Sequence, residues 1–255
     1  MNRTGLAIVL AIAIVIGVAF GCYPQLDLEV SALFFNASEH KFLFGQLESV
    51  EYLRDAARAV TALLVTPALL TLLVKIIMPK RRGLIGTRAA LLLALSLALG
   101  PGLITNPILK DHWGRYRPLD VIPFGGPDPF LPWYDPRGGC LGNCSFIAGE
   151  PSGAFWTVAP AALAPPQYRP IAYAAAVAFG VTVGIVRIGG GAHFFTDVVF
   201  AGVIEFLLVW ILHGLLYRWR ATRISDEAVD RALGQVSETL RRSVAWIGLG
   251  RRKPG

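Results

Sequence analysis

The sequence predicts an all-α integral-membrane protein, folded as a helical bundle with six transmembrane helices. Hydrophobic residues make up 54% of the chain and charged residues only 16%, which is not the profile of a soluble domain. Several apolar runs approach or exceed the roughly 20 residues that a membrane-spanning helix needs. The basic residues cluster between these runs. The net charge of +7 therefore indicates membrane topology, and we expect no nucleic-acid partner.

The first half of the chain contains three predicted spans. The first runs from Gly5 to about Cys22. A cleaved signal peptide is the alternative, but the run is long for one and no small-residue cleavage site follows it. The second covers about Tyr52 to Met78, and the third about Thr87 to Leu109. The basic cluster Pro79-Lys80-Arg81-Arg82 between them marks the cytoplasmic side by the positive-inside rule. Near the start of the second span, Arg54 and Arg58 could lie at the interface or face the bundle interior.

The second half supplies three more spans and a tail. The spans cover about Pro151–Ala164, Ile171–Ile185 and His193–Leu216. Residues 1–223 would form one membrane domain, followed by an amphipathic cytoplasmic tail at 224–255. That tail could lie on anionic lipid or be a solvated helix. Six spans place both termini in the cytoplasm. They also place the polar Lys110–Glu150 segment and the Arg187–His193 segment together on the outer side.

Two cysteines, Cys140 and Cys144, lie four residues apart in the polar segment. A zinc site needs more ligands than this pair supplies, so we expect no metal there. In an oxidising compartment they could form a local disulfide, and two free thiols are the alternative.

Three clusters carry candidate chemistry, and the last along the chain is the most informative. His193 and Asp197 are four residues apart, so on a helix they share one face and the carboxylate can reach the imidazole. Such a pairing fixes the tautomer of a histidine and raises its basicity, as a nucleophile requires. Arg187 adds a guanidinium suited to a phosphate. The alternative is a juxtamembrane loop whose charges only mark the membrane edge.

The other two clusters lie upstream. Lys110, Arg115 and Arg117 concentrate positive charge on the side where basic residues are normally depleted, which indicates an anionic ligand. In the stretch from Ser145 to Ala154, free backbone N–H groups at a helix start would add an anion site near Gly149, Ser152 and Gly153. Glu150 could orient a basic residue or donate a proton. A simple charge that complements the helix dipole is an equal alternative.

Together these clusters resemble the motifs of the type 2 phosphatidic acid phosphatases (PAP2), in the acid phosphatase/vanadium haloperoxidase superfamily. The family carries Lys-x6-Arg-Pro, then Pro-Ser-Gly-His, then Ser-Arg-x5-His-x3-Asp. Lys110-x6-Arg117-Pro118 matches in full, and Arg187-x5-His193-x3-Asp197 matches except that Val186 replaces the serine.

The middle motif departs from the family. Ala154 stands in the histidine's place if Pro151-Ser152-Gly153 is aligned. In the other register, Glu150 takes the histidine's place and Ala148 the serine's. We prefer the second register because it resembles bacterial lipid phosphatases, including some that act on lipid A.

The resemblance implies a PAP2-like core and a mechanism with no cofactor and no metal. His193 would attack phosphorus and form a phosphohistidine, with Asp197 orienting it. The phosphoryl oxygens would be held by basic side chains and by the backbone around the middle motif: Lys110, Arg117, Arg187, Gly149, Ser152 and Gly153. Glu150 would donate the proton to the leaving group.

The predicted function is that of a phosphatase acting on a phosphorylated membrane lipid, in a bacterial inner membrane with its site facing the periplasm. A lipid A phosphate is favoured. Undecaprenyl pyrophosphate, phosphatidylglycerol phosphate and phosphatidic acid are alternatives. The altered middle motif also leaves open a lipid phosphotransferase or a protein that binds phospholipid without hydrolysing it.

Overall fold

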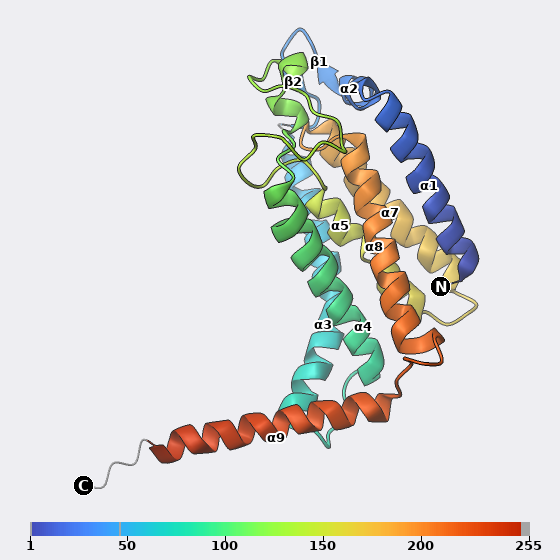
Figure 1. Ribbon diagram of the computed structural model, residues 1–255, viewed down its shortest axis with the longest axis vertical. Coiled ribbons are helices and arrows are strands. Elements are labelled where there is room, and N and C mark those ends of the chain that lie inside the picture. Colours follow the sequence, from blue (N-terminus) through green and yellow to red (C-terminus); the bar gives the residue numbers. More distant parts are fainter. Residues whose placement is uncertain (1, 46, 251–255) are drawn as a thin grey trace.

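The long helices run side by side as a bundle, with the extended loops gathered at one end (Figure 1). The computed structural model describes residues 2–45 and 47–250, with side chains up to Ser243. The predicted tail therefore ends outside the described residues, at 251–255. The main helices are α1 (Arg3–Cys22), α3 (Glu48–Ile77), α4 (Thr87–Leu99), α7 (Arg169–Gly189) and α8 (Phe195–His213).

In the described part of the chain, five helical segments are long and apolar enough to cross a membrane. Two of them are completed by π-helix: α4 continues as η1 (Gly100–Lys110), and α8 as η4 (Gly214–Arg218). Pro101 and Pro107 lie in η1, and each removes a backbone N–H from the helical ladder, which favours such a distortion. The segments are 3–22, 48–77, 87–110, 169–189 and 195–218.

One of the six expected spans, Pro151–Ala164, is not confirmed. Its residues instead form two short helices, α5 (Gly149–Phe155) and α6 (Val158–Leu163), with a break between them. Even as one continuous helix, residues 149–163 would extend only about 22 Å, short of the roughly 30 Å hydrocarbon core. Most of their side chains are buried among the longer helices. This pair occupies the interior of the bundle, and its apolar character reflects burial in protein.

Two glycines on α7 allow α5 and α8 to pack closely against it. A Cβ atom on Gly180 would lie 2.2 Å from the Phe155 ring, and one on Gly184 would lie 2.3 Å from the Val198 side chain. Small residues four apart are a common way to bring membrane helices together. The close packing brings the end of α7 and the starts of α5 and α8 to one place, where the candidate site lies.

The loop end is closed by short elements and an aromatic cluster. These elements are α2 (Gln25–Ala32), the two-stranded antiparallel sheet of β1 (Phe35–Asn36) and β2 (Lys41–Phe42), and the 3-10 turns η2 (Pro118–Asp120) and η3 (Ile122–Phe124). The rings of Phe35, Phe42 and Phe124 lie 5.1–5.2 Å apart, centroid to centroid. Cys140 and Cys144 form a disulfide in the same region, which settles the choice that the sequence left open.

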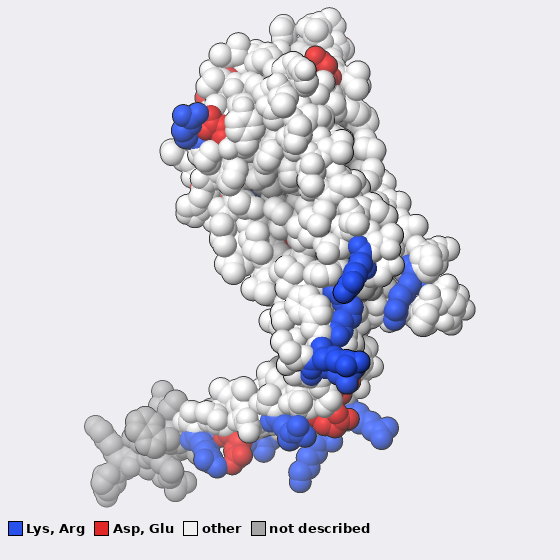
Figure 2. Space-filling view, turned by 45° about the vertical axis from the view of Figure 1, so that its right-hand side comes forward, with Lys and Arg blue, Asp and Glu red and all other residues white. Residues whose placement is uncertain are grey.

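The tail is helical, as expected, and is attached to the bundle. Helix α9 (Asp226–Gly250) lies across the ends of α3 and α4 (Figure 1). Asp230 pairs with Lys75 at 2.7 Å and accepts a hydrogen bond from Thr87. Figure 2 shows basic side chains gathered at this end of the molecule, whereas the loop end of the same face carries few charges. The division into domains at 223/224 stays a prediction.

Candidate active site

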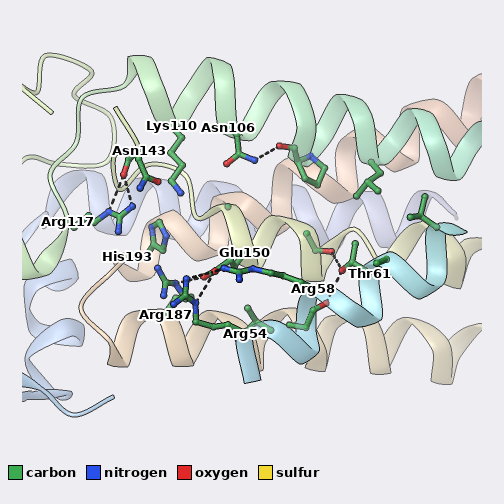
Figure 3. Close-up of a pocket in the computed structure, with 18 residues that line it drawn as sticks. Arg54, Arg58, Thr61, Asn106, Lys110, Arg117, Asn143, Glu150, Arg187 and His193 are labelled. Atoms are coloured by element: carbon green, nitrogen blue, oxygen red, sulfur yellow. Dashed lines mark hydrogen bonds and ion pairs between the residues drawn. The ribbon is translucent and has the colours of Figure 1, made fainter. Parts of the chain in front are cut away.

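A cavity of about 650 Å³ lies between α3, α5, α7 and η1 at the loop end of the bundle (Figure 3). Seven of the predicted site residues line it: His193, Lys110, Arg117, Arg187, Glu150, Gly149 and Gly153. Three segments distant in sequence thus bring the predicted residues together. The cavity also carries polar residues that the motifs did not predict: Arg54, Arg58, Thr61, Asn106 and Asn143.

His193 is held in one orientation at the wall of this cavity. Its Nδ1 lies 2.7 Å from the backbone oxygen of Ser145. A carbonyl oxygen only accepts hydrogen bonds, so Nδ1 carries the proton and Nε2 keeps its lone pair. Burial, with the positive charges of Arg187, Lys110 and Arg117, holds the pKa of His193 well below its ordinary value. The imidazole is therefore neutral near pH 7, which is the form that a nucleophile needs.

Asp197 does not hydrogen-bond His193 directly, contrary to expectation. The shortest distance, from Nδ1 to Oδ2, is 4.0 Å. Because α8 begins at Phe195, His193 precedes the helix and the one-face relation of helical residues four apart does not apply. The Asp197 carboxylate instead turns back to accept the Phe194 backbone N–H at 2.8 Å, as a residue in the first turn often does. Its Oδ2 also accepts from the Ser145 hydroxyl at 2.5 Å. Asp197 thus acts on the histidine through Ser145.

Arg115 was expected in the anion-binding cluster, but it lies behind the site and is fully buried. Its two terminal nitrogens pair with Asp197 and with Asp27, the latter at 2.7 Å. Asp27 also accepts from the backbone and hydroxyl of Thr196, at 3.0 and 2.6 Å. The Phe194 ring stacks on the guanidinium at 4.3 Å. One buried cation thus neutralises two buried carboxylates and fixes the start of α8, next to His193.

The disulfide loop positions Arg117. The backbone oxygen of Asn143 accepts from Arg117 Nη2 at 2.6 Å and from Nε at 3.2 Å. The loop itself is fixed by Asp111, which accepts the Asn143 N–H at 3.0 Å, and by the Cys144 N–H, which donates to the Lys110 oxygen at 2.9 Å. Lys110 and Arg117 therefore reach the cavity from one segment, which its hydrogen bonds to the disulfide loop hold in place.

Glu150 lies at the centre of an arginine cluster. Its Oε2 pairs with Arg187 at 2.7 Å, and its Oε1 pairs with Arg54 at 2.8 Å and Arg58 at 2.6 Å. Burial alone would raise the pKa of the Glu150 carboxyl, but the hydrogen bond from Arg54 and the charge of Arg187 outweigh it and hold the pKa below its ordinary value. Glu150 is therefore ionised at neutral pH. This geometry favours the role of orienting basic residues over that of donating a proton.

The remaining predicted residues belong to α5, and the structure separates them. Glu150 and Gly153 face the cavity, whereas Ser152 is buried on another side of the helix, since residues two apart do not share a face. The Ser152 hydroxyl donates to Glu205 at 2.6 Å, so it is not brought to the cavity. A Cβ on Gly149 would lie 3.0 Å from the Asn106 oxygen. Because Gly149 has no side chain, Asn106 and Lys110 can lie close to its backbone.

No group of three or more His, Cys, Asp or Glu residues arranged to hold a metal is found in the part of the chain that the structure describes. The positive charge in the cavity comes from lysine and arginine.

The profile of the PAP2 superfamily matches residues 89–224, slightly more than half of the chain.

The chain belongs to the PAP2 superfamily.

Among curated PAP2 relatives, a protein of Francisella tularensis subsp. novicida (strain U112) named lipid A 4'-phosphatase is 33% identical over 219 residues. That alignment covers 86% of this chain and 98% of the relative. Proteins of the same name from Rhizobium leguminosarum and Rhizobium etli are each 36% identical, over 104 and 103 residues. These two alignments cover 41% and 40% of this chain, and 45% and 40% of the relatives. No solved structure matches the chain.

The PAP2 match contains the residues of the three motifs, but not every residue of the site. Arg54 and Arg58 come from α3, and Asp27 from α2, all before residue 89. Asp27 lies in a mixed, surface-like segment, where its sequence gave no sign of burial. Arg54 and Arg58 carried a weak signal, because charged residues four apart near the start of an apolar span are expected to face a partner.

Proposed function

We propose that this PAP2 protein is an integral-membrane lipid phosphatase that works through a phosphohistidine at His193. One observation carries the proposal: a neutral imidazole with a fixed tautomer lines a cavity beside Lys110, Arg117 and Arg187. A non-hydrolytic binder has no need for such a nucleophile.

In this mechanism, Nε2 of His193 attacks phosphorus and the bond between phosphorus and the lipid oxygen breaks. The electron pair leaves with the lipid oxygen, which takes up a proton from solvent water. Water then attacks the phosphohistidine and gives up a proton to solvent, and inorganic phosphate leaves as Nε2 regains its lone pair. Lys110, Arg117 and Arg187 hold the phosphoryl oxygens and stabilise the charge of the transition state. These cations supply the charge stabilisation that a metal ion supplies elsewhere, so the mechanism uses no cofactor.

The proposed substrate is a lipid A phosphate, at the 4' position named for the relatives. A lipid substrate also suits the cavity, because its polar part with His193 continues into an apolar part lined by Ala62, Val65 and Leu97. Undecaprenyl pyrophosphate and phosphatidylglycerol phosphate remain the alternatives, since each presents a phosphate on an apolar carrier.

We further propose that the site faces the periplasm of a bacterial inner membrane, with both termini cytoplasmic, because the buried α5–α6 pair returns the chain from the loop end to the opposite end between the long spans. On the face drawn in Figure 2, the exposed basic residues gather at the opposite end of the bundle, as the positive-inside rule expects of a cytoplasmic end. The disulfide at Cys140–Cys144 lies at the site end, and disulfides persist in oxidising compartments such as the periplasm.

Phosphate release by the detergent-solubilised protein tests the activity. The substrates are lipid A, undecaprenyl pyrophosphate, phosphatidylglycerol phosphate and phosphatidic acid, each with and without EDTA. We expect release from lipid A that EDTA does not reduce. Intact binding without release would favour the non-hydrolytic reading. Transfer of the phosphoryl group to an added acceptor lipid would indicate a phosphotransferase.

The role of Glu150 has its own test. If Glu150 holds the arginines, Glu150→Gln removes about 1.5–3 kcal/mol of charge-assisted hydrogen bonding, and kcat/KM falls on the order of ten- to a hundredfold. Because no proton transfer is lost, the fall should be similar for an alkyl phosphate and for p-nitrophenyl phosphate, whose leaving group needs no protonation. A proton donor would instead make the loss large for the alkyl ester and small for the aryl ester.

The pH profile gives an independent check. A carboxylate with a lowered pKa keeps its arginines bound above that pKa and releases them as pH falls through it. The wild-type rate should therefore show no loss from Glu150 titration between pH 5 and 8, and should fall only in more acidic solution. A rate that rises as pH falls across that window, and no longer rises in Glu150→Gln, would assign the proton-donor role.

A further inference from the structure

We propose that Arg54 and Arg58 form a second anion subsite, which takes an additional acidic group of the lipid, located between the reacting phosphate and the apolar part. The proposal rests on the proposed phosphatase function. It concerns which lipids the same cavity selects: it favours a lipid with a second acidic group near the reacting phosphate, as in the pyrophosphate and phosphatidylglycerol phosphate alternatives, over one whose phosphate is joined to a neutral sugar.

The positions of the two arginines define where the second group would lie. Arg54 and Arg58 are four residues apart on α3, and with Thr61 they line one side of the cavity. A helix rises 1.5 Å per residue, so Arg58 lies about 6 Å further along α3 than Arg54. Figure 3 shows His193, Glu150, Arg58 and Thr61 in that order along the cavity. Arg58 thus lies beyond the catalytic residues, on the way to the apolar part, and Arg54 lies beside Glu150.

The apolar lining begins just past the arginines. Ala62 and Val65 continue the same face of α3, and Leu97 lies opposite them on α4. A lipid with its phosphate at His193 and its apolar part along these residues must run past Arg54 and Arg58. The portion of the lipid next to the arginines would be the group that links the phosphate to the apolar part.

The lining of the cavity carries more positive than negative charge, so it can neutralise a second anion. Five cations line it, at positions 54, 58, 110, 117 and 187, against the single carboxylate of Glu150. Lys110, Arg117 and Arg187 are the cations that the PAP2 motifs assign to the reacting phosphate. Arg54 and Arg58 are additional to these three cations, and they lie outside residues 89–224, which match the PAP2 superfamily. Residues added to a shared catalytic set are suited to distinguishing substrates.

The present partners of the two arginines are exchangeable. Arg54 pairs with Glu51 at 2.6 Å and Arg58 with Asp55 at 2.9 Å, but both carboxylates are 66% exposed and neither lines the cavity. Exposed pairs of this kind contribute about 0–1 kcal/mol. Their shared partner Glu150 uses one oxygen for both, and a guanidinium has five N–H donors. An acidic group of the lipid can therefore replace Glu51 and Asp55 while Glu150 stays bound.

Two matched pairs of lipids test the subsite and separate its possible ligands. Phosphatidylglycerol phosphate has an internal phosphodiester that phosphatidic acid lacks, so this pair tests an acidic group spaced from the reacting phosphate. A prenyl pyrophosphate and the prenyl monophosphate test an acidic group directly attached to it. For each pair the measured quantity is the ratio of kcat/KM, doubly acidic over singly acidic lipid.

Arg58→Gln is the main variant because Arg58 is the more exposed of the two arginines and has fewer bonds to Glu150. We expect it to lower the ratio on the order of tenfold in at least one pair, the loss of a hydrogen bond to a charged group, and Arg54→Gln to lower it in the same pair. Arg137→Gln is the control. Arg137 is an exposed arginine in the outer loop, bonded to Asp135 and absent from the cavity lining, and its ratio should equal that of the wild type.

Failure of the subsite and failure of the phosphatase function give different results. If wild type hydrolyses the lipids and Arg58→Gln lowers both members of each pair equally, the subsite is refuted and the function stands. If wild type hydrolyses none of the lipids, equilibrium binding is measured instead, with short-chain forms of the same lipid pairs. The two proteins compared are His193→Ala and His193→Ala/Arg58→Gln. Equal preference for the doubly acidic lipid in both would then refute the subsite.

Discussion

His193→Ala abolishes turnover, with kcat falling on the order of 10⁴-fold or more, because the variant loses the nucleophile and no neighbouring group can replace it. Phosphate release from the best lipid, measured with purified protein, checks this result. The nitrogen that attacks is lost while the cavity keeps its cations, so we expect lipid binding to persist. His193→Gln, which retains a polar group of similar length, should be equally inactive.

The loss must be separated from a folding defect. Both variants should enter the membrane and elute as the wild type does in detergent, and their thermal midpoints should stay close to that of the wild type. Full activity in a folded His193→Ala protein would refute the nucleophile assignment.

Arg115→Leu should be the most destabilising of the site substitutions. It leaves the buried Asp27 and Asp197 next to each other with no cation between them. Removing one partner from a buried ion pair costs about 3–5 kcal/mol. We expect a loss of that size in the free energy of unfolding, measured by denaturant titration in detergent. Activity should fall as well, because Asp197 holds Ser145 and Ser145 holds the imidazole.

A double variant shows whether the loss comes from the unpaired carboxylates. Asp27→Leu removes one of them, so Arg115→Leu/Asp27→Leu should be less destabilised than the sum of the two single variants. Arg137→Leu, at an exposed arginine, should change stability by less than about 0.5 kcal/mol. Strictly additive losses, or a loss under 1 kcal/mol for Arg115→Leu, would contradict the assigned role of Arg115.

The sequence predicted the residues of the cavity better than the contacts between them. The spacing of Lys110, Arg117, Arg187 and His193, together with the alternating sides of the spans, was sufficient to place them together. It did not predict the Asp27–Thr196 contact, which joins residues 169 positions apart. Pairing across such separations depends on tertiary packing, and a single sequence carries no signal of it.

Two errors have a common origin in local geometry. The expected contact of His193 with Asp197 assumed that α8 begins at His193, and a start two residues later is enough to remove it. Ser152 was assigned to phosphate from its motif, but the turn of α5 directs it to Glu205. The span expected at Pro151–Ala164 is not confirmed, because hydropathy does not distinguish a short helix buried in protein from one in lipid.

The most direct test of the central claim is to trap the phosphoenzyme. The protein is mixed with a lipid carrying a ³²P-labelled phosphate, quenched in alkali, in which phosphohistidine is stable, and digested to identify the labelled residue and nitrogen. Because Nδ1 donates to the Ser145 oxygen, we predict a label on His193 at Nε2, absent in His193→Ala. Turnover without any phosphoprotein, or a label at Nδ1 or on another residue, would contradict the mechanism.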